Sequence, residues 1–548
     1  MSRDRDRAFF GHPIGLATLF FTEMFERFSY YGMRAFLIFY IAAPKSLGGQ
    51  GMFIINKEGN WEPDASAGAI LGVFGASVYL LSLPGGWIAD RFIGQRLAVT
   101  IGGIGIALGN GILAIPALED YFYGGLVLIA FGTGFLKPNV STLVGQLYRP
   151  DDVRRDSGFT IYYMGINIGA TLAPFACGYL AQDNDFRAFL VDKGLDPNLS
   201  WHFAFGAAAI GMVGGLIQYV FGQRWLGDAG KHPTIPSDPL RAERDRTVVK
   251  VIVLALLGLA ALVVFAKPSK DMITNVMGIG LVLGSIAMFI GLYQSARDAG
   301  EKRRIVAMIP LFIGAIGFFG IFEQAPTTLN IFAESHTAET IFGLEIPSSY
   351  YQSVNGFFIV ALAPLFAWIW LRLARAKKEP SSVNKFAIGM VVLAFSFVVM
   401  LPSLPNVDAG IRVSPGYLMT LYLIYTIAEL CISPVGLSSM SKLAPQRLAG
   451  MVMGMWFLGT AIGIYLAGRA TSISESNGFG FLFIFLIICS LTMAAGLFIV
   501  APMIRKMMGK EAAHASAPAD MSEKVGPEPL PTATAKVVEK KSEKKKDD

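Results

Sequence analysis

The sequence predicts an all-α membrane protein made of two six-helix bundles with a two-helix hairpin inserted between them. Of the 548 residues, 53% are hydrophobic and only 16% are charged, whereas soluble proteins carry about a quarter charged residues. The mean hydropathy is +0.51. The chain also contains a series of apolar stretches long enough to cross a bilayer, which takes roughly 20 residues. These observations disfavour a soluble enzyme, a secreted disulfide scaffold and a disordered chain.

Fourteen apolar stretches are predicted to be transmembrane helices. Glycine is frequent in the chain, at 60 residues, and small residues let membrane helices approach closely. The seventh stretch is the shortest. The predicted spans are 13–43, 66–90, 97–116, 121–147, 157–181, 201–222, 250–266, 272–294, 305–329, 350–371, 385–402, 414–441, 448–471 and 479–504.

The loops between the spans alternate in basic charge, which predicts their side of the membrane by the positive-inside rule. The segment 325–349 contains no Lys or Arg. The basic loops hold Arg91 and Arg96; Arg149, Arg154 and Arg155; Arg241, Arg244 and Arg246; Arg297, Lys302, Arg303 and Arg304; and Arg372, Arg375, Lys377 and Lys378. Both termini are therefore expected in the cytoplasm, and the net charge of +6 is an orientation signal rather than evidence of nucleic-acid binding.

Removing the seventh and eighth spans together leaves the charge pattern intact, so we interpret them as an inserted hairpin. The expected division is an N-terminal bundle at 1–222, a cytoplasmic linker and hairpin at 223–304, and a C-terminal bundle at 305–509. The tail at 510–548 is rich in Ala, Pro, Glu and Lys, which predicts a disordered cytoplasmic segment.

Nothing in the sequence predicts a cofactor, a metal site or a disulfide. The three cysteines, Cys177, Cys431 and Cys489, lie inside apolar stretches. The spans contain no evident set of metal ligands and no evident nucleophile beside a base. A membrane-embedded enzyme is therefore disfavoured.

The first span carries a stripe of charged residues. At about 100° per residue, Glu23, Glu26, Arg27, Tyr30 and Arg34 fall within one arc of roughly 100°. Charges within a membrane helix are costly and normally face a bundle interior or a water-filled cavity. The alternative is a purely structural ion-pair cluster.

Three further charges lie in other spans and match across the two halves. With the hairpin set aside, Arg34 and Glu323 occupy core helices 1 and 7, and Lys137 and Glu429 occupy core helices 4 and 10. If these two ion pairs formed alternately, each would hold the two halves together at one end of the molecule. The seven intramembrane charges comprise three cations and four carboxylates, so one carboxylate is left over and favours binding a proton. Proline follows both Lys137 and Glu429 closely, and ordinary helix kinks are the alternative reading of those prolines.

Three motifs resemble those of the proton-dependent oligopeptide transporter family, which has the major facilitator fold. Residues 23–32 (EMFERFSYYG) resemble its ExxERFxYYG motif, and residues 85–91 (GGWIADR) are similar to its GGxxAD signature. Residues 162–169 (YYMGINIG) resemble FYxxINxG, with Tyr162 where Phe is usual. The resemblance extends over the twelve core helices and over the hairpin, which is typical of bacterial members.

The resemblance implies roles for individual residues. Arg34 and Lys137 would receive a peptide carboxylate and Glu429 the peptide ammonium. Proton coupling would involve Glu23, Glu26, Arg27 and Glu323. The peptide backbone would contact Asn167 and Asn355, and the pocket would be lined by Tyr30, Tyr31, Tyr79 and Trp456. The gate ion pairs would be Arg34 with Glu323 and Lys137 with Glu429.

Two features depart from family members. Phe319 stands where some bacterial members have Trp, four residues before the helix-7 glutamate, which would alter side-chain preference. No histidine lies in the interior of a span, since His12 and His202 are near span ends. Coupling through an intramembrane histidine, as suggested for animal relatives, is therefore not expected.

The expected function is a proton-coupled symporter that imports di- and tripeptides by alternating access across the bacterial inner membrane. A zwitterionic peptide presents one carboxylate and one ammonium, which match cations on one half and a carboxylate on the other. The expected partners are the peptide, protons and membrane lipid, without nucleic acid, and the chain is expected to be a monomer. The alternatives are a related carrier of nitrate or a peptide-like drug, although Glu429 would repel a simple anion, and a sensor that binds peptides without moving them.

Overall fold

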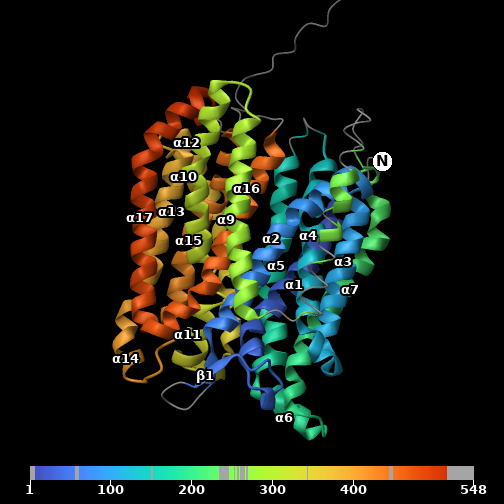
Figure 1. Cartoon of the computed structure of the whole chain (residues 1–548), viewed down its shortest axis with the longest axis vertical. Coiled ribbons are helices and arrows are strands. Elements are labelled where there is room, and N and C mark those ends of the chain that lie inside the picture. Colours follow the sequence, from blue (N-terminus) through green and yellow to red (C-terminus); the bar gives the residue numbers. More distant parts are fainter. Residues whose placement is uncertain are drawn as a thin grey trace, which may run out of the picture.

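The computed structural model describes residues 6–55, 61–149, 152, 154–233, 243, 246–251, 253–255, 258, 266, 269–341, 343–443 and 448–514. The described chain is nearly all helical and forms two bundles that stand side by side (Figure 1). The N-terminal half contains α1 (Ile14–Ala42), α2 (Ala65–Ile88), α3 (Gln95–Ala114), α4 (Phe122–Gln146), α5 (Arg155–Gln182) and α7 (Ser200–Gly222). The C-terminal half contains α10 (Ala299–Phe322), α11 (Thr328–His336), α12 (Tyr351–Arg375), α13 (Ser382–Val398), α15 (Gly416–Leu443), α16 (Ala449–Arg469) and α17 (Thr471–His514).

Short elements connect these helices. Two antiparallel hairpins pair β1 (Phe53–Ile55) with β2 (Trp61–Pro63) and β3 (Thr340–Ile341) with β4 (Leu344–Glu345). Helices α6 (Asn184–Asp192) and α14 (Leu404–Asp408), like β1, lie at the end of the molecule away from the N-terminus (Figure 1). The other short helical segments are η1 (Lys45–Leu47), η2 (Ala89–Ile93), η3 (Pro116–Tyr121), η4 (Pro197–Leu199), η5 (Gln223–Trp225), η7 (Ser348–Tyr350) and η8 (Leu401–Ser403).

The predicted all-α membrane fold is confirmed. Eleven helices of the described chain are long and apolar enough to cross a membrane. Helix α1 also spans 29 residues, but it carries the charged stripe. Helix α15 has a shorter apolar stretch, Gly416–Ile432. The predicted span 250–266 and the tail beyond 514 lie largely or wholly outside the described residues, so the total of fourteen spans stays a prediction.

One predicted span differs from the structure. The span predicted at 305–329 is divided, because α10 ends at Phe322 and α11 begins at Thr328. Pro326 lies in the break and has no N–H to continue the helix. Side chains replace part of the missing backbone pairing, since Thr327 donates to the Glu323 carbonyl over 3.1 Å. Glu323 is thereby placed at the broken end of a helix.

Helix α9 (Lys270–Gln294) corresponds to the second helix of the predicted hairpin. It packs against α2, α10 and α16, and so it contacts both halves from outside (Figure 1). The Tyr465 hydroxyl fixes it to α16 by donating to the Thr274 carbonyl over 3.1 Å. The hairpin helix therefore adds to the core bundles without taking a place inside them.

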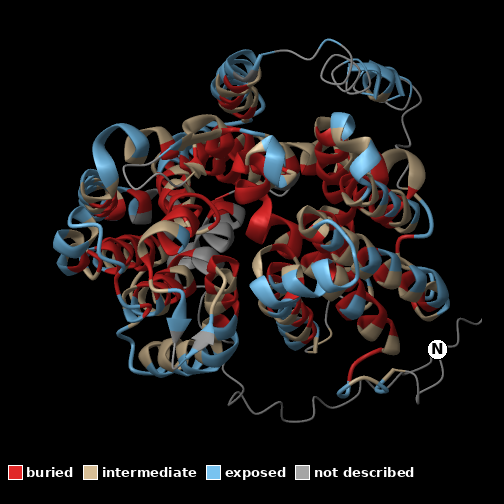
Figure 2. Cartoon of the chain, turned by 90° about the horizontal axis from the view of Figure 1, so that it is seen from below, coloured by how far each residue is buried: buried red, intermediate tan, exposed pale blue. Residues whose placement is uncertain are grey.

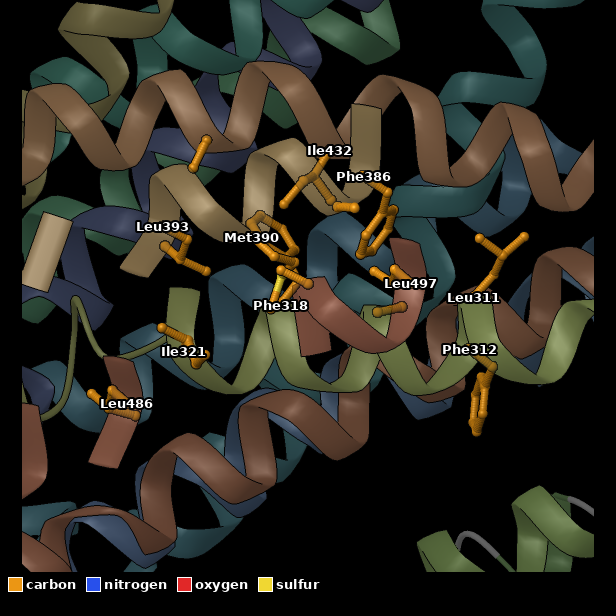
Figure 3. Close-up of a cluster of buried hydrophobic side chains, with 14 of the residues drawn as sticks. Leu311, Phe312, Phe318, Ile321, Phe386, Met390, Leu393, Ile432, Leu486 and Leu497 are labelled. Atoms are coloured by element: carbon orange, nitrogen blue, oxygen red, sulfur yellow. The ribbon is translucent and has the colours of Figure 1, made fainter. Parts of the chain in front are cut away.

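Each half has a buried apolar core, and apolar side chains also cover its outer surface. In the C-terminal half the core joins α10, α13, α15 and α17, where Phe318, Phe386 and Ile432 meet (Figure 3). Figure 2 shows buried residues inside the bundles and exposed ones around the outside. Ile210 and Ile499 are 74% and 78% exposed, as expected of side chains that face lipid.

The two halves meet through glycines where α2 crosses α16. A Cβ added at Gly468 would lie 2.6 Å from the Gly72 Cα, and one added at Gly72 would lie 2.9 Å from the Gly468 Cα. Only glycine permits this backbone approach. The same end is joined by Glu475, which accepts from the Ala65 backbone N–H over 2.7 Å. The halves are thus in direct contact away from the N-terminus.

The N-terminal segment is anchored to the loop between α4 and α5. The His12 ring bonds the Tyr148 hydroxyl over 2.9 Å and approaches the Ser157 hydroxyl at 3.5 Å. Arg154 pairs with Asp152 over 2.9 Å beside this ring. Burial, aided by the Arg154 charge, lowers the pKa of His12 below its ordinary value of 6.5, although Asp152 acts in the opposite sense.

This anchor predicts an acid-sensitive contribution to stability. The folded state disfavours protonated His12. The contribution of neutral His12 to the free energy of unfolding is therefore complete above pH 6.5. It is lost as the pH falls below that value towards the lower pKa of the folded state. On going from pH 8 to pH 5.5, the wild type should lose more stability than His12→Gln, by less than about 1 kcal/mol. Thermal unfolding of both proteins at the two pH values measures the difference. Equal losses would contradict the role of His12.

The crossing of α2 and α16 predicts that a larger side chain opens this end of the molecule. In Gly468→Leu, overpacking of about 1–3 kcal/mol should shift the ratio of closed to open forms by roughly 5- to 150-fold. Spin labels at positions 55 and 411, whose native isoleucines are 60% and 57% exposed, should then report longer distances. Gly496→Leu is the matched control, because a Cβ there would meet nothing within 4 Å. An unchanged distance distribution in Gly468→Leu would exclude this steric role.

Candidate functional site

The charged stripe of α1 is buried inside the N-terminal half. Glu23, Glu26 and Arg27 are 1%, 0% and 3% exposed. The Arg27 Nε lies 2.9 Å from Glu23 Oε1 and 2.5 Å from Glu26 Oε2. Tyr162 of α5 donates to Glu23 over 2.7 Å. One cation thus faces two carboxylates, and the cluster keeps a net negative charge when both are ionised.

Arg34 of α1 pairs with Glu323, and this contact joins the two halves. The two residues are 5% and 7% exposed. The break between α10 and α11 presents Glu323 towards α1. Beside the pair, Asn330 and Gln352 both donate to the Ala35 carbonyl, over 2.8 Å and 3.1 Å. The pair is therefore set in a polar contact between α1 and the C-terminal half.

Tyrosines surround the cations of the N-terminal half. The Arg27 guanidinium lies 5.6 Å from the Tyr30 ring centroid and 5.9 Å from that of Tyr31. The Lys137 ammonium lies 3.8 Å from the centroid of Tyr79. This is a close cation–π contact, which stabilises a cation without neutralising its charge. Lys137 is half-buried on α4 and keeps its positive charge available for an anion.

Glu429 on α15 is positioned by neutral partners. The Asn355 amide donates to Glu429 Oε2 over 3.1 Å and to the Thr426 hydroxyl over 3.0 Å. In the described chain, neither Glu429 nor Lys137 takes part in an ion pair. The carboxylate is thus oriented but not neutralised, which suits it to receive a cation.

Aromatic rings lie beside these charges. Phe319 packs edge-on against Trp456, with centroids 5.9 Å apart. Tyr79 contacts Phe457 with a centroid separation of 6.3 Å, so rings from α2 and α16 meet across the halves. Such walls accept varied apolar side chains.

Further hydrogen bonds between the halves lie at the end away from the N-terminus. Gln182, at the end of α5, donates to Ser348 over 2.9 Å and to Glu334 over 3.2 Å. The side-chain oxygen Oε1 of Gln182 accepts from the Ser349 backbone N–H over 3.3 Å. Together with the pair of Arg34 and Glu323, these bonds hold that end closed.

The remaining predicted site residue, Asn167, is 4% exposed, and its amide donates to the Tyr163 carbonyl of its own helix over 2.9 Å. Helices α5 and α12 touch here, because a Cβ added at Gly356 would lie 3.4 Å from the Asn167 carbonyl. Asn167 therefore lies close to the backbone next to Asn355.

The sequence reasoning missed several polar partners. The motif shows Tyr162 only as a substitution for Phe, whereas in the structure its hydroxyl donates to Glu23. Thr426 lies three residues before Glu429, and this helical spacing was the available signal for it. Gln182, Asn330 and Gln352 bond across the interface between the halves, and no local pattern in the sequence reveals such contacts.

Known proteins resemble this chain over most of its length. The family model described as "POT family" matches residues 96–479. A Bacillus subtilis (strain 168) protein named "Uncharacterized transporter YclF" is 39% identical over 508 residues, which cover 92% of this chain and 96% of the relative. The "Di-/tripeptide transporter" of Lactococcus lactis subsp. cremoris is 36% identical over 514 residues, with 92% and 98% covered.

Solved structures agree with this relationship. A crystal structure of a peptide transporter POT in complex with sulfate is 38% identical and has a TM-score of 0.78, with 91% of this chain and 96% of that chain covered. A POT family transporter in complex with 5-aminolevulinic acid is 33% identical, with a TM-score of 0.79 and coverages of 90% and 98%. The predicted major facilitator fold is thereby confirmed, and the chain belongs to the POT family.

Proposed function

We propose that the chain is a proton-coupled symporter that imports di- and tripeptides by alternating access. The observation that carries the proposal is a pair of charges that form no ion pair with any described residue, Lys137 on the N-terminal half and Glu429 on the C-terminal half. The two ends of a zwitterionic peptide fit these charges. Two relatives support the substrate class by name, the "Di-/tripeptide transporter" of Lactococcus lactis subsp. cremoris and the "Peptide transporter YePEPT" of Yersinia enterocolitica, which is 37% identical over 477 residues.

The peptide carboxylate would bind Lys137 and Arg34, and the ammonium would bind Glu429. Arg34 is held by Glu323 in this structure, so it becomes available only when that pair breaks. Arg binds a carboxylate with two parallel hydrogen bonds, whereas Lys acts as a point charge. Asn167 and Asn355 would hold the peptide backbone. The rings of Tyr30, Tyr31, Tyr79 and Trp456 would line the space for side chains.

Proton coupling follows from competition for Arg34. Protonation of Glu323 removes the charge that attracts Arg34, which then turns to the peptide carboxylate. The peptide and the proton thereby favour the same rearrangement, which is the thermodynamic requirement for symport. Glu23, Glu26 and Arg27 would provide the second proton-coupling site, next to Lys137.

Alternating access would use the two matched pairs in turn. Opening of the end away from the N-terminus requires Arg34 to leave Glu323 and Gln182 to leave Glu334. Pairing of Lys137 with Glu429 would then close the opposite end. With both termini in the cytoplasm of a bacterial cell, the end away from the N-terminus would face the outside, and this structure would correspond to the state closed to the outside. The halves at 1–222 and 305–509 would move as units within a monomer, joined by the segment 223–304, and the tail at 510–548 would be a disordered cytoplasmic extension.

A peptide-like solute is the second candidate for the cargo. A POT family structure with 33% identity contains 5-aminolevulinic acid, a molecule with an amino group and a carboxylate at its two ends. The same separated charges would bind it. Competition between such a molecule and dialanine for uptake separates the two cargo classes.

Glu323→Gln should abolish uphill uptake and keep exchange. The neutral amide cannot carry a proton, so a pH gradient no longer drives accumulation, and we expect at least a tenfold loss. Counterflow exchange of labelled dialanine needs no net proton movement and should stay within about twofold of the wild type. Both rates are measured in proteoliposomes with an acidic exterior. Normal uphill uptake by the variant would refute the proton role of Glu323.

Lys137→Ala and Glu429→Ala should each weaken peptide binding. Loss of one charged contact of about 1.5–3 kcal/mol predicts a roughly 10- to 150-fold higher Kd for dialanine. Calorimetric titration of the purified protein measures it. Lys193→Ala is a matched control, because Lys193 lies beyond α6, away from the site. An unchanged Kd in either site variant would exclude the proposal that Lys137 and Glu429 bind the two charged ends of the peptide.

A further inference from the structure

Three tyrosines in the C-terminal half have buried hydroxyls that bond to nothing in the described chain. Tyr351, Tyr422 and Tyr425 are 3%, 1% and 0% exposed, and none of their hydroxyl oxygens has a hydrogen-bond partner among the described residues. Most buried polar groups in proteins are paired, with protein atoms or with ordered water. Three hydroxyls on α12 and α15 without a partner among the described residues are therefore suited to bind ordered water, which can both donate and accept hydrogen bonds.

Helical spacing aligns these hydroxyls with the charged site. Tyr422, Tyr425, Thr426 and Glu429 share one face of α15 at i, i+3, i+4 and i+7. Tyr351 and Asn355 share a face of α12 at i and i+4, and the two helices pack together. The Asn355 bonds to Thr426 and Glu429 show that these two faces meet.

Successive members of the series lie near one another. The Tyr422 and Tyr425 rings meet edge-on with centroids 5.9 Å apart, Tyr422 lies within electrostatic range of Tyr351, and Tyr425 lies within that range of Glu323 and Glu429. The Tyr425 ring also stacks on Phe322, with centroids 4.4 Å apart and planes 14° apart. That stack places Tyr425 directly beside the helix break that carries Glu323.

The series runs from the closed end towards the two carboxylates. Tyr351 follows η7, whose Ser348 and Ser349 bond Gln182 where the halves are closed. From Tyr422 to Glu429 the rise along α15 is roughly 10 Å. This distance is too long for direct contact, but one or two water molecules per step would bridge it.

We propose that Tyr351, Tyr422 and Tyr425 line a buried water-binding path between α12 and α15, and that this path carries protons from the closed end to Glu323. Each hydroxyl or water accepts a proton on one side and releases another on the far side, so only one proton moves overall and no group changes its charge. The ion pair with Arg34 keeps Glu323 ionised until a proton arrives. The proposal rests on the proposed proton-coupled transport.

The path would separate the proton route from the peptide route. The peptide must wait until the halves part, whereas a proton passes along hydroxyls and waters while they are still closed. Arrival of the proton at Glu323 weakens its attraction for Arg34, which loosens the contact between the halves. The proton would thus arrive first and open the way for the peptide.

Tyr425→Phe and Tyr422→Phe test the path, because each removes one hydroxyl and keeps the ring. Tyr219→Phe is the matched control: Tyr219 is 0% exposed, lies in the other half and bonds the Arg96 carbonyl over 3.3 Å. In proteoliposomes, proton-driven dialanine uptake should fall about tenfold in the two site variants, and counterflow exchange should stay within about twofold. Tyr219→Phe should keep the wild-type ratio of driven uptake to exchange. Unchanged driven uptake in both site variants would overturn the path.

A second measurement is independent of transport. Hydroxyl radicals made by radiolysis of bound water should label Tyr422 and Tyr425 in the folded wild-type protein, and should label Tyr219 much less. Labelling of Tyr422 and Tyr425 no stronger than that of Tyr219 would overturn the water-binding path. If the wild type exchanges no peptide, the proposed function fails, and the labelling result still decides whether water occupies the path.

Discussion

The pairing of Arg34 with Glu323 is the interaction on which the rest of the arrangement depends. It joins a helix of the first half to the broken helix of the second, deep within the membrane-spanning region. Two charges of opposite sign are tolerated there because each neutralises the other, and either one alone would be costly. In the proposed function the same property would make the pair a switch, since neutralising one partner weakens its attraction for the other. The contacts of Ala35, Gln182 and Gly468 with the opposite half also join the two halves.

The site is asymmetric in its charges, and this asymmetry suits it to a zwitterion. Lys137 rests against the Tyr79 ring, and Glu429 is held by Asn355. Neutral partners orient both charges without cancelling them, so the two groups stay available to a ligand. In contrast, Arg27 faces Glu23 and Glu26 at close range, which leaves that cluster with a surplus carboxylate that a proton can neutralise. In the proposed function, ligand binding and proton binding would fall to neighbouring groups that share Arg34.

Local sequence patterns predicted the elements that depend on local physics. Helix bounds followed from apolar length, and the stripe of Glu23, Arg27 and Arg34 on one face of α1 followed from 3.6-residue periodicity. The predicted span 305–329 is divided in the structure at Glu323–Thr327, and the signals for this break were its polar residues and Pro326. The cross-interface roles of Gln182, Asn330 and Gln352 could not be predicted, because hydrogen bonds between distant segments leave no periodic trace in the chain.

The sequence by itself determined that the chain is a helical membrane protein, which residues carry charge within the membrane, and which helices they occupy. The free-energy cost of burying polar and charged groups in the membrane decides these properties, and each segment's own composition sets that cost. Only the tertiary structure decided which charges meet. It paired Arg34 with Glu323 and, among the described residues, left Lys137 and Glu429 without ionic partners and the hydroxyls of Tyr351, Tyr422 and Tyr425 without hydrogen-bond partners. These outcomes depend on how the two bundles dock and on backbone contact at glycines, because distances between segments are set by packing and not by any one segment.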